Sequence, residues 1–281
     1  MGVYKEYICL FLWISGGLLI PGMSQNREDK DLVLGIPEEK FAHPLYLVGQ
    51  KTDSAFYYSR IFTPVCDDSV CNLVKLDVYW NLAGKYLSFD TVPGFPLTKN
   101  DHQLFVTRDY EKLHSILQDE YSVLSRIEKN ELVQTNKPEK QDGVDGYSGA
   151  TAKELKQDVV EGASFSSFTL WNLVNGDVRE IIRKNTIKQY LPKIEQQLLK
   201  SHDSDMVLLA LKNWNKEDYC SRFDVILELI KRGDALVNFY ILKNLQGDIL
   251  RDKSNQQSIK NIMPQLDEYT RAFIKKYVDT K

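Results

Sequence analysis

The sequence predicts an α+β fold, with an N-terminal antiparallel sheet and a helix followed by an all-α, HEAT-like helical region. Apolar and polar residues alternate in short runs before residue 100, which is typical of strands. From residue 164 onward, apolar residues recur at helical spacing in one short run after another. Between the two, Gln134 to Gly143 has no apolar side chain of any size and indicates a linker or exposed loop.

Three runs predict the strands of the sheet. Residues 54–62 alternate with mostly aromatic side chains, whereas the short apolar run Leu45–Val48 before them has little to identify it. The clearest strand is Leu73–Trp80, where the even-numbered residues face one side and the odd-numbered residues the other. Asn81–Gly84 reads as a turn and Tyr86–Phe89 as the partner strand. We therefore expect an antiparallel sheet with one covered face.

The first helical signal follows this sheet. Thr107 is placed to cap a helix whose apolar stripe contains Tyr110, Leu113 and Leu117. After the polar loop, a second helical pattern starts at Ala152 and includes Leu155, Val159 and Val160, with Gly162 as a candidate break.

The remaining chain reads as helix after helix. Residues 164–174 are strongly apolar, and Asn175–Asp177 is expected to end that helix and cap the next. Phe165, Phe168 and Trp171 suit plain core, with packing against a flat ring system as the alternative. Beyond Leu191, short helices with short connectors resemble a small HEAT-like array, although no repeat of fixed length is clear.

Composition limits the function classes. The chain has 281 residues, 43% of them hydrophobic and 27% charged, which is enough for a sizeable core in one or two domains. The net charge is −3 and no basic patch is visible, so nothing indicates a nucleic acid or an anionic membrane surface as partner.

The N-terminus has the pattern of a secretory signal peptide. Lys5 precedes the apolar run Tyr7–Ile20, and Gly22 and Ser24 are small residues placed for cleavage before Gln25. We expect a periplasmic or secreted protein without a membrane span after cleavage; an uncleaved anchor is the alternative. The predicted divisions are residues 1–24 for the signal peptide, 25–163 for the α+β domain and 164–281 for the helical domain.

Export would place the cysteines in an oxidising compartment. Cys66 and Cys71 flank a tight polar loop between two strand-like runs, so we expect them to form a local disulfide. A zinc site is the alternative, but it needs further Cys or His ligands that are not nearby. Cys220, at the edge of an apolar helix, is expected to be a small buried residue.

The candidate site is Asp145–Thr151, which opens onto a predicted helix N-terminus. Gly146 and Gly149 let a ligand approach the backbone closely, and the free N–H groups of a helix start favour a phosphate. Ser148 and Thr151 add hydroxyls. An ordinary loop with a helix cap is the alternative interpretation.

This stretch resembles the flavin-attachment signature of the FMN-binding domain family, Asp-x-x-Ser/Thr-Gly-Ala-Ser/Thr. That family includes the C subunit of the sodium-translocating NADH:quinone reductase and the G subunit of the Rnf complex. The matching positions are Asp145, Ser148, Gly149, Ala150 and Thr151. The resemblance implies that Thr151 is the residue that would carry FMN through a phosphoester bond. Gly84-Lys85 and the stretch from Thr91 to Gly94 also resemble the family's turn and Thr-Pro-Gly segment, with Val92 extra.

Two functions follow from these patterns. The first is an exported FMN-binding electron-transfer module with an unidentified redox partner protein, in which covalent and non-covalent binding both stay open. The second is a non-enzymatic exported helical scaffold or interaction module. A hydrolase is a distant third, because no nucleophile–base set can be named.

Overall fold

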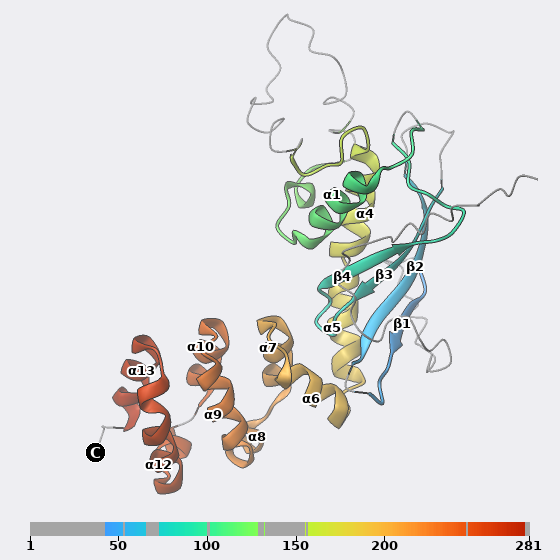
Figure 1. The fold of residues 1–281 in the computed structure, drawn as a ribbon. Coiled ribbons are helices and arrows are strands. Elements are labelled where there is room, and N and C mark those ends of the chain that lie inside the picture. Colours follow the sequence, from blue (N-terminus) through green and yellow to red (C-terminus); the bar gives the residue numbers. More distant parts are fainter. Residues whose placement is uncertain are drawn as a thin grey trace, which may run out of the picture.

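The computed structural model describes residues 43–52, 54–65, 73–99, 102–128, 132, 155, 157–245 and 247–278. They form an α+β fold in which a sheet near the N-terminus is followed by a long succession of helices (Figure 1). The sheet is antiparallel and has the strand order β1-β2-β3-β4. Its strands are Leu45–Val48 (β1), Phe56–Pro64 (β2), Leu73–Trp80 (β3) and Tyr86–Thr91 (β4).

The alternation of β3 is confirmed residue by residue. Val74, Leu76, Val78 and Trp80 are all buried, whereas the intervening side chains are only partly buried. Since successive side chains of a strand point to opposite faces, this pattern gives the sheet one covered and one open face. The predicted strand over residues 54–62 is confirmed as β2, and the last strand extends two residues further than expected.

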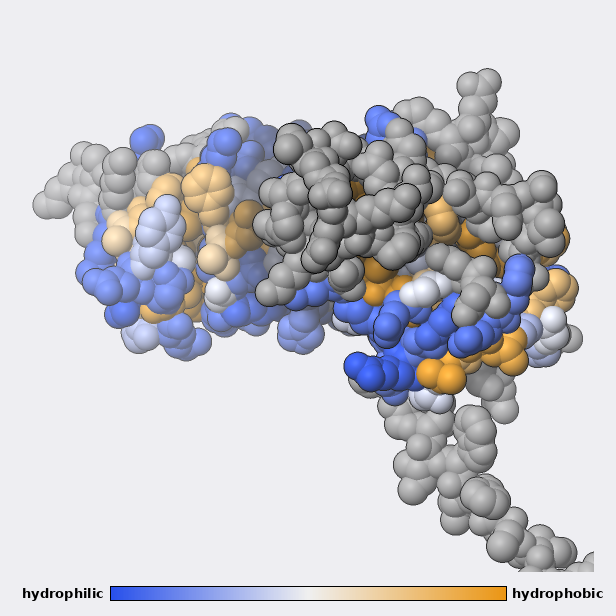
Figure 2. Space-filling view, turned by 90° about the horizontal axis from the view of Figure 1, so that it is seen from above, coloured by the Kyte–Doolittle hydropathy of each residue, from blue (hydrophilic) through white to orange (hydrophobic). Residues whose placement is uncertain are grey.

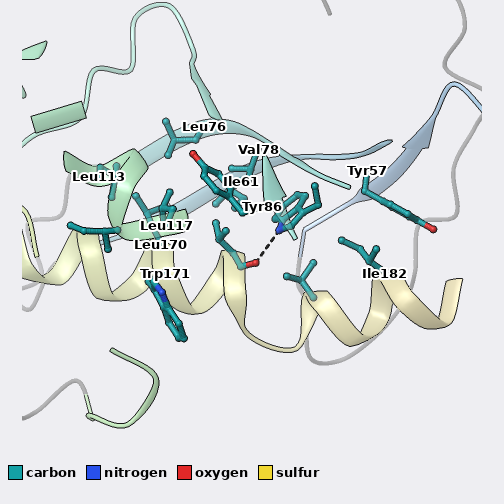
Figure 3. Close-up of a cluster of buried hydrophobic side chains, with 14 of the residues drawn as sticks. Tyr57, Ile61, Leu76, Val78, Tyr86, Leu113, Leu117, Leu170, Trp171 and Ile182 are labelled. Carbon is teal, nitrogen blue, oxygen red and sulfur yellow. Dashed lines mark hydrogen bonds between the residues drawn. The ribbon is translucent and has the colours of Figure 1, made fainter. Parts of the chain in front are cut away.

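Three helices cover one face of the sheet. They are α1 (Thr107–Gln118), α4 (Ser164–Asn175) and α5 (Val178–Lys188), and Figure 1 shows them on the same side of the strands. Figure 3 shows Leu170 and Ile182 from these helices facing Val78 and Ile61 of the sheet. Trp80 is completely buried, and its Nε1–H donates to the carbonyl of Val174 at 2.9 Å.

The turn between β3 and β4 fastens the sheet to α5. The Thr186 hydroxyl donates to the Leu82 carbonyl at 2.8 Å, and Arg183 Nε donates to the Ala83 carbonyl at 2.9 Å. Gly84 has a φ of 79°, and an added Cβ there would lie 2.7 Å from the Arg179 carbonyl oxygen. Glycine is therefore required by both the backbone conformation and the close approach of α5.

Beyond α5 the helices follow one another as two directly packed pairs and a third pair whose two helices both pack against the short helix between the second and third pairs. The pairs are α6 (Pro192–Lys200) with α7 (Ser204–Asn213), α9 (Phe223–Arg232) with α10 (Ala235–Asn244), and α12 (Lys253–Ile262) with α13 (Glu268–Val278). The short helices α8 (Lys216–Ser221) and α11 (Gly247–Arg251) connect successive pairs. Two short 3-10 helices complete the described elements, Val123–Ser125 and Met263–Gln265.

An aspartate recurs before the second helix of each pair. The Asp203 carboxylate accepts N–H bonds at the start of α7, Asp234 does so for α10 and Asp267 for α13. The spacings are 31 and 33 residues, so a repeat exists that apolar periodicity alone did not reveal. The pairs are linked where the Ser204 hydroxyl donates to Asp234 at 2.6 Å.

Two clusters of buried apolar side chains meet at α7. The first contains the sheet, α1, α4, α5 and α6, together with Met206 and Ala210. The second contains Val207 and Leu211 and continues to α13. The domain boundary expected between residues 163 and 164 stays a prediction. Apolar side chains from before and after this boundary pack into the same first cluster.

Several local expectations were wrong. Thr107 is the first residue of α1 rather than its cap, and the Asp109 carboxylate instead accepts the N–H of Val106 at 3.0 Å. Asp177 precedes α5 without a side-chain cap bond. Cys220 is exposed rather than buried, because its neighbour Tyr219 takes the inward position of the short helix α8.

The helix expected from Ala152 does not reach Val160. Leu155 and Gln157 are helical, but Val159 lies in a bend and Gly162 in a turn with a φ of 73°. The N–H of Val160 donates to the Ser167 hydroxyl at 3.0 Å, so it is bound by the start of α4 instead of by a helical carbonyl.

Candidate functional site

The predicted site residues lie outside the described part of the chain. These are the five positions of the flavin-like signature, the two cysteines of the expected disulfide and the expected signal peptide: Asp145, Ser148, Gly149, Ala150, Thr151, Cys66, Cys71 and residues 1–24. They stay predictions. The structure does describe what stands on either side of Asp145–Thr151, and those neighbours locate the ends of the segment that contains it.

Both ends of the segment 133–154 are held in the first apolar cluster. Leu132, just before it, is 0% exposed, and Leu155, just after it, is 5% exposed. The cluster also contains the covered face of the sheet and the inner faces of α1 and α4. The residues on either side of the segment that contains the candidate site are therefore anchored in the sheet domain.

Polar contacts hold the described chain just after this segment. Asp158 Oδ2 accepts the hydroxyl of Ser122 at 2.6 Å and the N–H of Val123 at 2.9 Å. Ser122 is 2% exposed and follows α1, so the bond joins the chain after the candidate site to the turn that ends α1. Lys99 packs over Gly162 in the next turn, with its Cδ 3.3 Å from where a Cβ would stand.

The aromatic residues of α4 are core, as the sequence indicated. Phe165 and Trp171 are 6% and 4% exposed, and Phe168 packs against the same cluster. In Figure 3, Trp171 lies on the side of α4 away from the strands, where its Nε1–H donates to the Asp119 carbonyl at 2.8 Å. Phe165 and Trp171 are therefore committed to packing α4 against its neighbours.

The open face of the sheet has an ordered row of tyrosines. Tyr46, Tyr58 and Tyr79 are register partners on β1, β2 and β3, with ring centroids 5.8 and 5.5 Å apart. Asp77 accepts a hydrogen bond from the Tyr58 hydroxyl and two from Arg60. Burial and the Asp77 hydrogen bond raise the pKa of Tyr58 to about 12. These polar side chains form their hydrogen bonds with one another, as is typical of a sheet face that is open to solvent.

One histidine belongs to the core side of the sheet. His114 Nδ1 lies 2.8 Å from the hydroxyl of Tyr86, and its ring packs against Tyr86 and Phe89. Burial lowers the pKa of His114 below its ordinary value. Within the described ranges, no three His, Cys, Asp or Glu side chains are grouped so as to hold a metal ion.

The helix pairs form an open pocket that sequence reasoning missed. It has a volume of about 210 Å³ and lies between the starts of α7 and α10 and the end of α9. Arg232 and Asp234 line it, but both are already bonded within the protein: Arg232 donates to the Leu199 carbonyl, and the Asp234 carboxylate accepts hydrogen bonds from the Ser204 hydroxyl and the Val237 N–H. The recurrence of an aspartate after 31 residues, at Asp203 and Asp234, is the sequence signal that could have indicated this contact between successive helix pairs.

Comparison with known proteins adds no relative. No family model, no curated protein and no solved structure matches the chain. In the part of the chain that the structure describes, no helix has the length and apolar character needed to cross a membrane. The resemblance at Asp145–Thr151 therefore has to be weighed on its own residues and on the structure around them.

Proposed function

We propose that this protein is an exported FMN-binding protein that holds the flavin at Asp145–Thr151 and passes electrons to a partner protein. The observation that carries this proposal is the signature itself, in which every fixed position of the family pattern is present. FMN would supply the redox chemistry, so the absence of a recognisable nucleophile–base set does not count against it.

The residue types suit a phosphate and its tether. Gly146 and Gly149 leave the backbone accessible, and Ser148 and Thr151 provide hydroxyls for hydrogen bonds or for a phosphoester bond. Asp145 would brace the turn. In the family that the signature resembles, the residue at the place of Thr151 is the one that carries the flavin.

The described residues support this location in two ways. An antiparallel sheet and α1 precede the signature, in the order that the resemblance leads one to expect. The residues that flank the segment, Leu132 and Leu155, are buried in the first apolar cluster, so the segment is attached to a packed domain at both of its ends. A site supported by a packed domain can hold a cofactor in one orientation.

The test is to produce the protein in a host that exports it and contains a flavin-attaching enzyme. The expected product is yellow, and its mass exceeds that of the chain by one FMN less one water. Thr151→Val should abolish the covalent adduct, whereas Ser148→Ala, the matched control, should retain it. Flavin released on denaturation would indicate non-covalent binding. Colourless protein with the mass of the bare chain would contradict the proposal.

A second candidate is a non-enzymatic interaction module. The observation that favours it is the stack of helix pairs, which leaves large apolar side chains exposed on α10 and α13. Arrays of this kind usually bind proteins through such surfaces. A flavin-free preparation that nevertheless binds a partner through these helices would favour this function over the first.

A further inference from the structure

Strand β1 forms one edge of the sheet and pairs with β2 alone among the described strands. In an antiparallel pair, successive residues point their N–H and C=O groups alternately toward the partner strand and away from it. Two of the four residues of β1 therefore direct these groups away from β2. At the other edge of the sheet, β4 packs against α1, whereas no described helix packs against β1 to the same extent.

The side chains of β1 do not protect this edge from pairing. Leu45–Val48 contains no charged residue and no proline, and its register with β2 has no bulge, although these features ordinarily keep a free edge from pairing. In the view of Figure 2, the visible hydrophobic surface of the described residues is divided into separate areas by hydrophilic residues. The edge is a more specific binding site than such areas, because its N–H and C=O groups accept only an extended segment.

A short apolar run precedes β1 in the chain, outside the described residues. It is Leu32–Ile36, and it stands between residues 29–31, which are all charged, and Pro37. Charged residues and proline commonly flank a hydrophobic strand. The five residues of the run match the four residues of β1 in length. In an extended chain, the two leucines and the isoleucine of the run share one side, and Val33 and Gly35 share the other.

The connection between this run and β1 favours pairing within one molecule. Eight residues separate Ile36 from Leu45, and neighbouring strands lie only about 4.8 Å apart. A short connection can join antiparallel strands, whereas parallel strands need a crossover of about a dozen residues or more. The connection therefore permits only the antiparallel direction. It also keeps the run at an effective concentration of about a millimolar near the edge, which favours it over a strand from another molecule.

We propose that residues 32–36 bind the free edge of β1 as a fifth, antiparallel strand. Directly opposed residues of an antiparallel pair point to the same face of the sheet. The leucines and the isoleucine of the run would therefore join Leu45 and Leu47, which are 2% and 3% exposed, on the covered face. Val33 would lie on the open face with Tyr46. The start of the chain would thus close this edge to strands of other molecules.

Amide hydrogen exchange of the purified full protein, resolved residue by residue by NMR, tests the proposal. All four N–H groups of β1 should be protected from exchange, although only two of them point toward β2. Leu34→Pro removes an N–H and restricts the backbone of the added strand, so the two outward N–H groups of β1 should exchange about tenfold faster or more. Asp29→Pro is the matched control: it places a proline before the apolar run and should leave the exchange of β1 unchanged.

Leu34→Asp provides a second variant, which keeps the N–H but would place a charge on the covered face, and it should have the same effect. The two inward N–H groups of β1 should stay protected in every variant and thereby show that the sheet is folded. Free exchange of the two outward N–H groups in the unsubstituted protein would overturn the proposal. So would equal exchange in Leu34→Pro and Asp29→Pro. Protection that is lost on dilution would assign the edge to a strand of a second molecule and would also overturn it.

Discussion

Replacing Gly84 with alanine tests whether α5 is pressed against the sheet. Gly84 has a φ of 79°, a conformation that costs an L-residue about 1–2 kcal/mol. The new Cβ would also lie 2.7 Å from the carbonyl oxygen and 2.8 Å from the Cα of Arg179. These are backbone atoms of a helix and cannot rotate away, so relieving the overlap adds about 1–3 kcal/mol. We expect a total loss of about 2–5 kcal/mol.

Gly94 supplies the control for this substitution. It has a φ of 84°, but nothing lies within 4 Å of an added Cβ. Gly94→Ala should therefore cost only the backbone strain, and the difference between the two variants isolates the contact with α5. That difference should be about 1–3 kcal/mol, which corresponds to several degrees in the melting temperature.

Urea unfolding followed by tryptophan fluorescence measures both variants, because Trp80 of β3 and Trp171 of α4 are buried in the first apolar cluster and become exposed on unfolding. Thermal unfolding by circular dichroism provides an independent comparison. If Gly84→Ala is as stable as Gly94→Ala or more stable, the turn does not lie close enough to α5 for an added Cβ to overlap the backbone of Arg179, which would refute the close contact inferred here.

Two further predictions concern buried polar groups. Thr186→Val keeps the shape of the side chain but removes the hydroxyl that donates to the Leu82 carbonyl, so it should cost about 1–3 kcal/mol in urea unfolding; an unchanged midpoint would contradict this. Burial lowers the pKa of His114 below 6.5, so the unfolded chain takes up this proton first as the pH falls. The free energy of unfolding should therefore fall below about pH 6.5. Between pH 7.5 and pH 5.5, His114→Gln should lose less of this free energy than the unsubstituted protein; equal losses in the two proteins would exclude His114 as the cause.

Local patterns in the sequence predicted most individual elements. Strand β3 runs from Leu73 to Trp80 as expected, and α9 ends at Arg232 before a left-handed Gly233. These succeed because alternation, helical spacing and glycine conformations are properties of a few neighbouring residues. Where a bond to a distant residue competes, the local pattern fails, as at Val160, whose N–H is taken by Ser167.

The candidate site shows the same limit. The residue types of Asp145–Thr151 suggest a phosphate site without any structure, because the chemistry lies in seven consecutive residues. The sequence did not show that Leu132 and Leu155 would be buried together, or that Asp158 would bind the turn after α1. It also missed the open pocket at the helix pairs, whose lining comes from three separate elements.

By itself, the sequence determined that a sheet precedes a long succession of helices, which face of β3 is covered and which chemistry is available at Asp145–Thr151. Only the tertiary structure decided that α4 and α5 cover the sheet, through contacts such as that of Trp80 with Val174, 94 residues apart. It also decided that α10 keeps an apolar side exposed. The physical reason is that periodicity records which side of an element is apolar, whereas the choice of what covers that side depends on long-range packing.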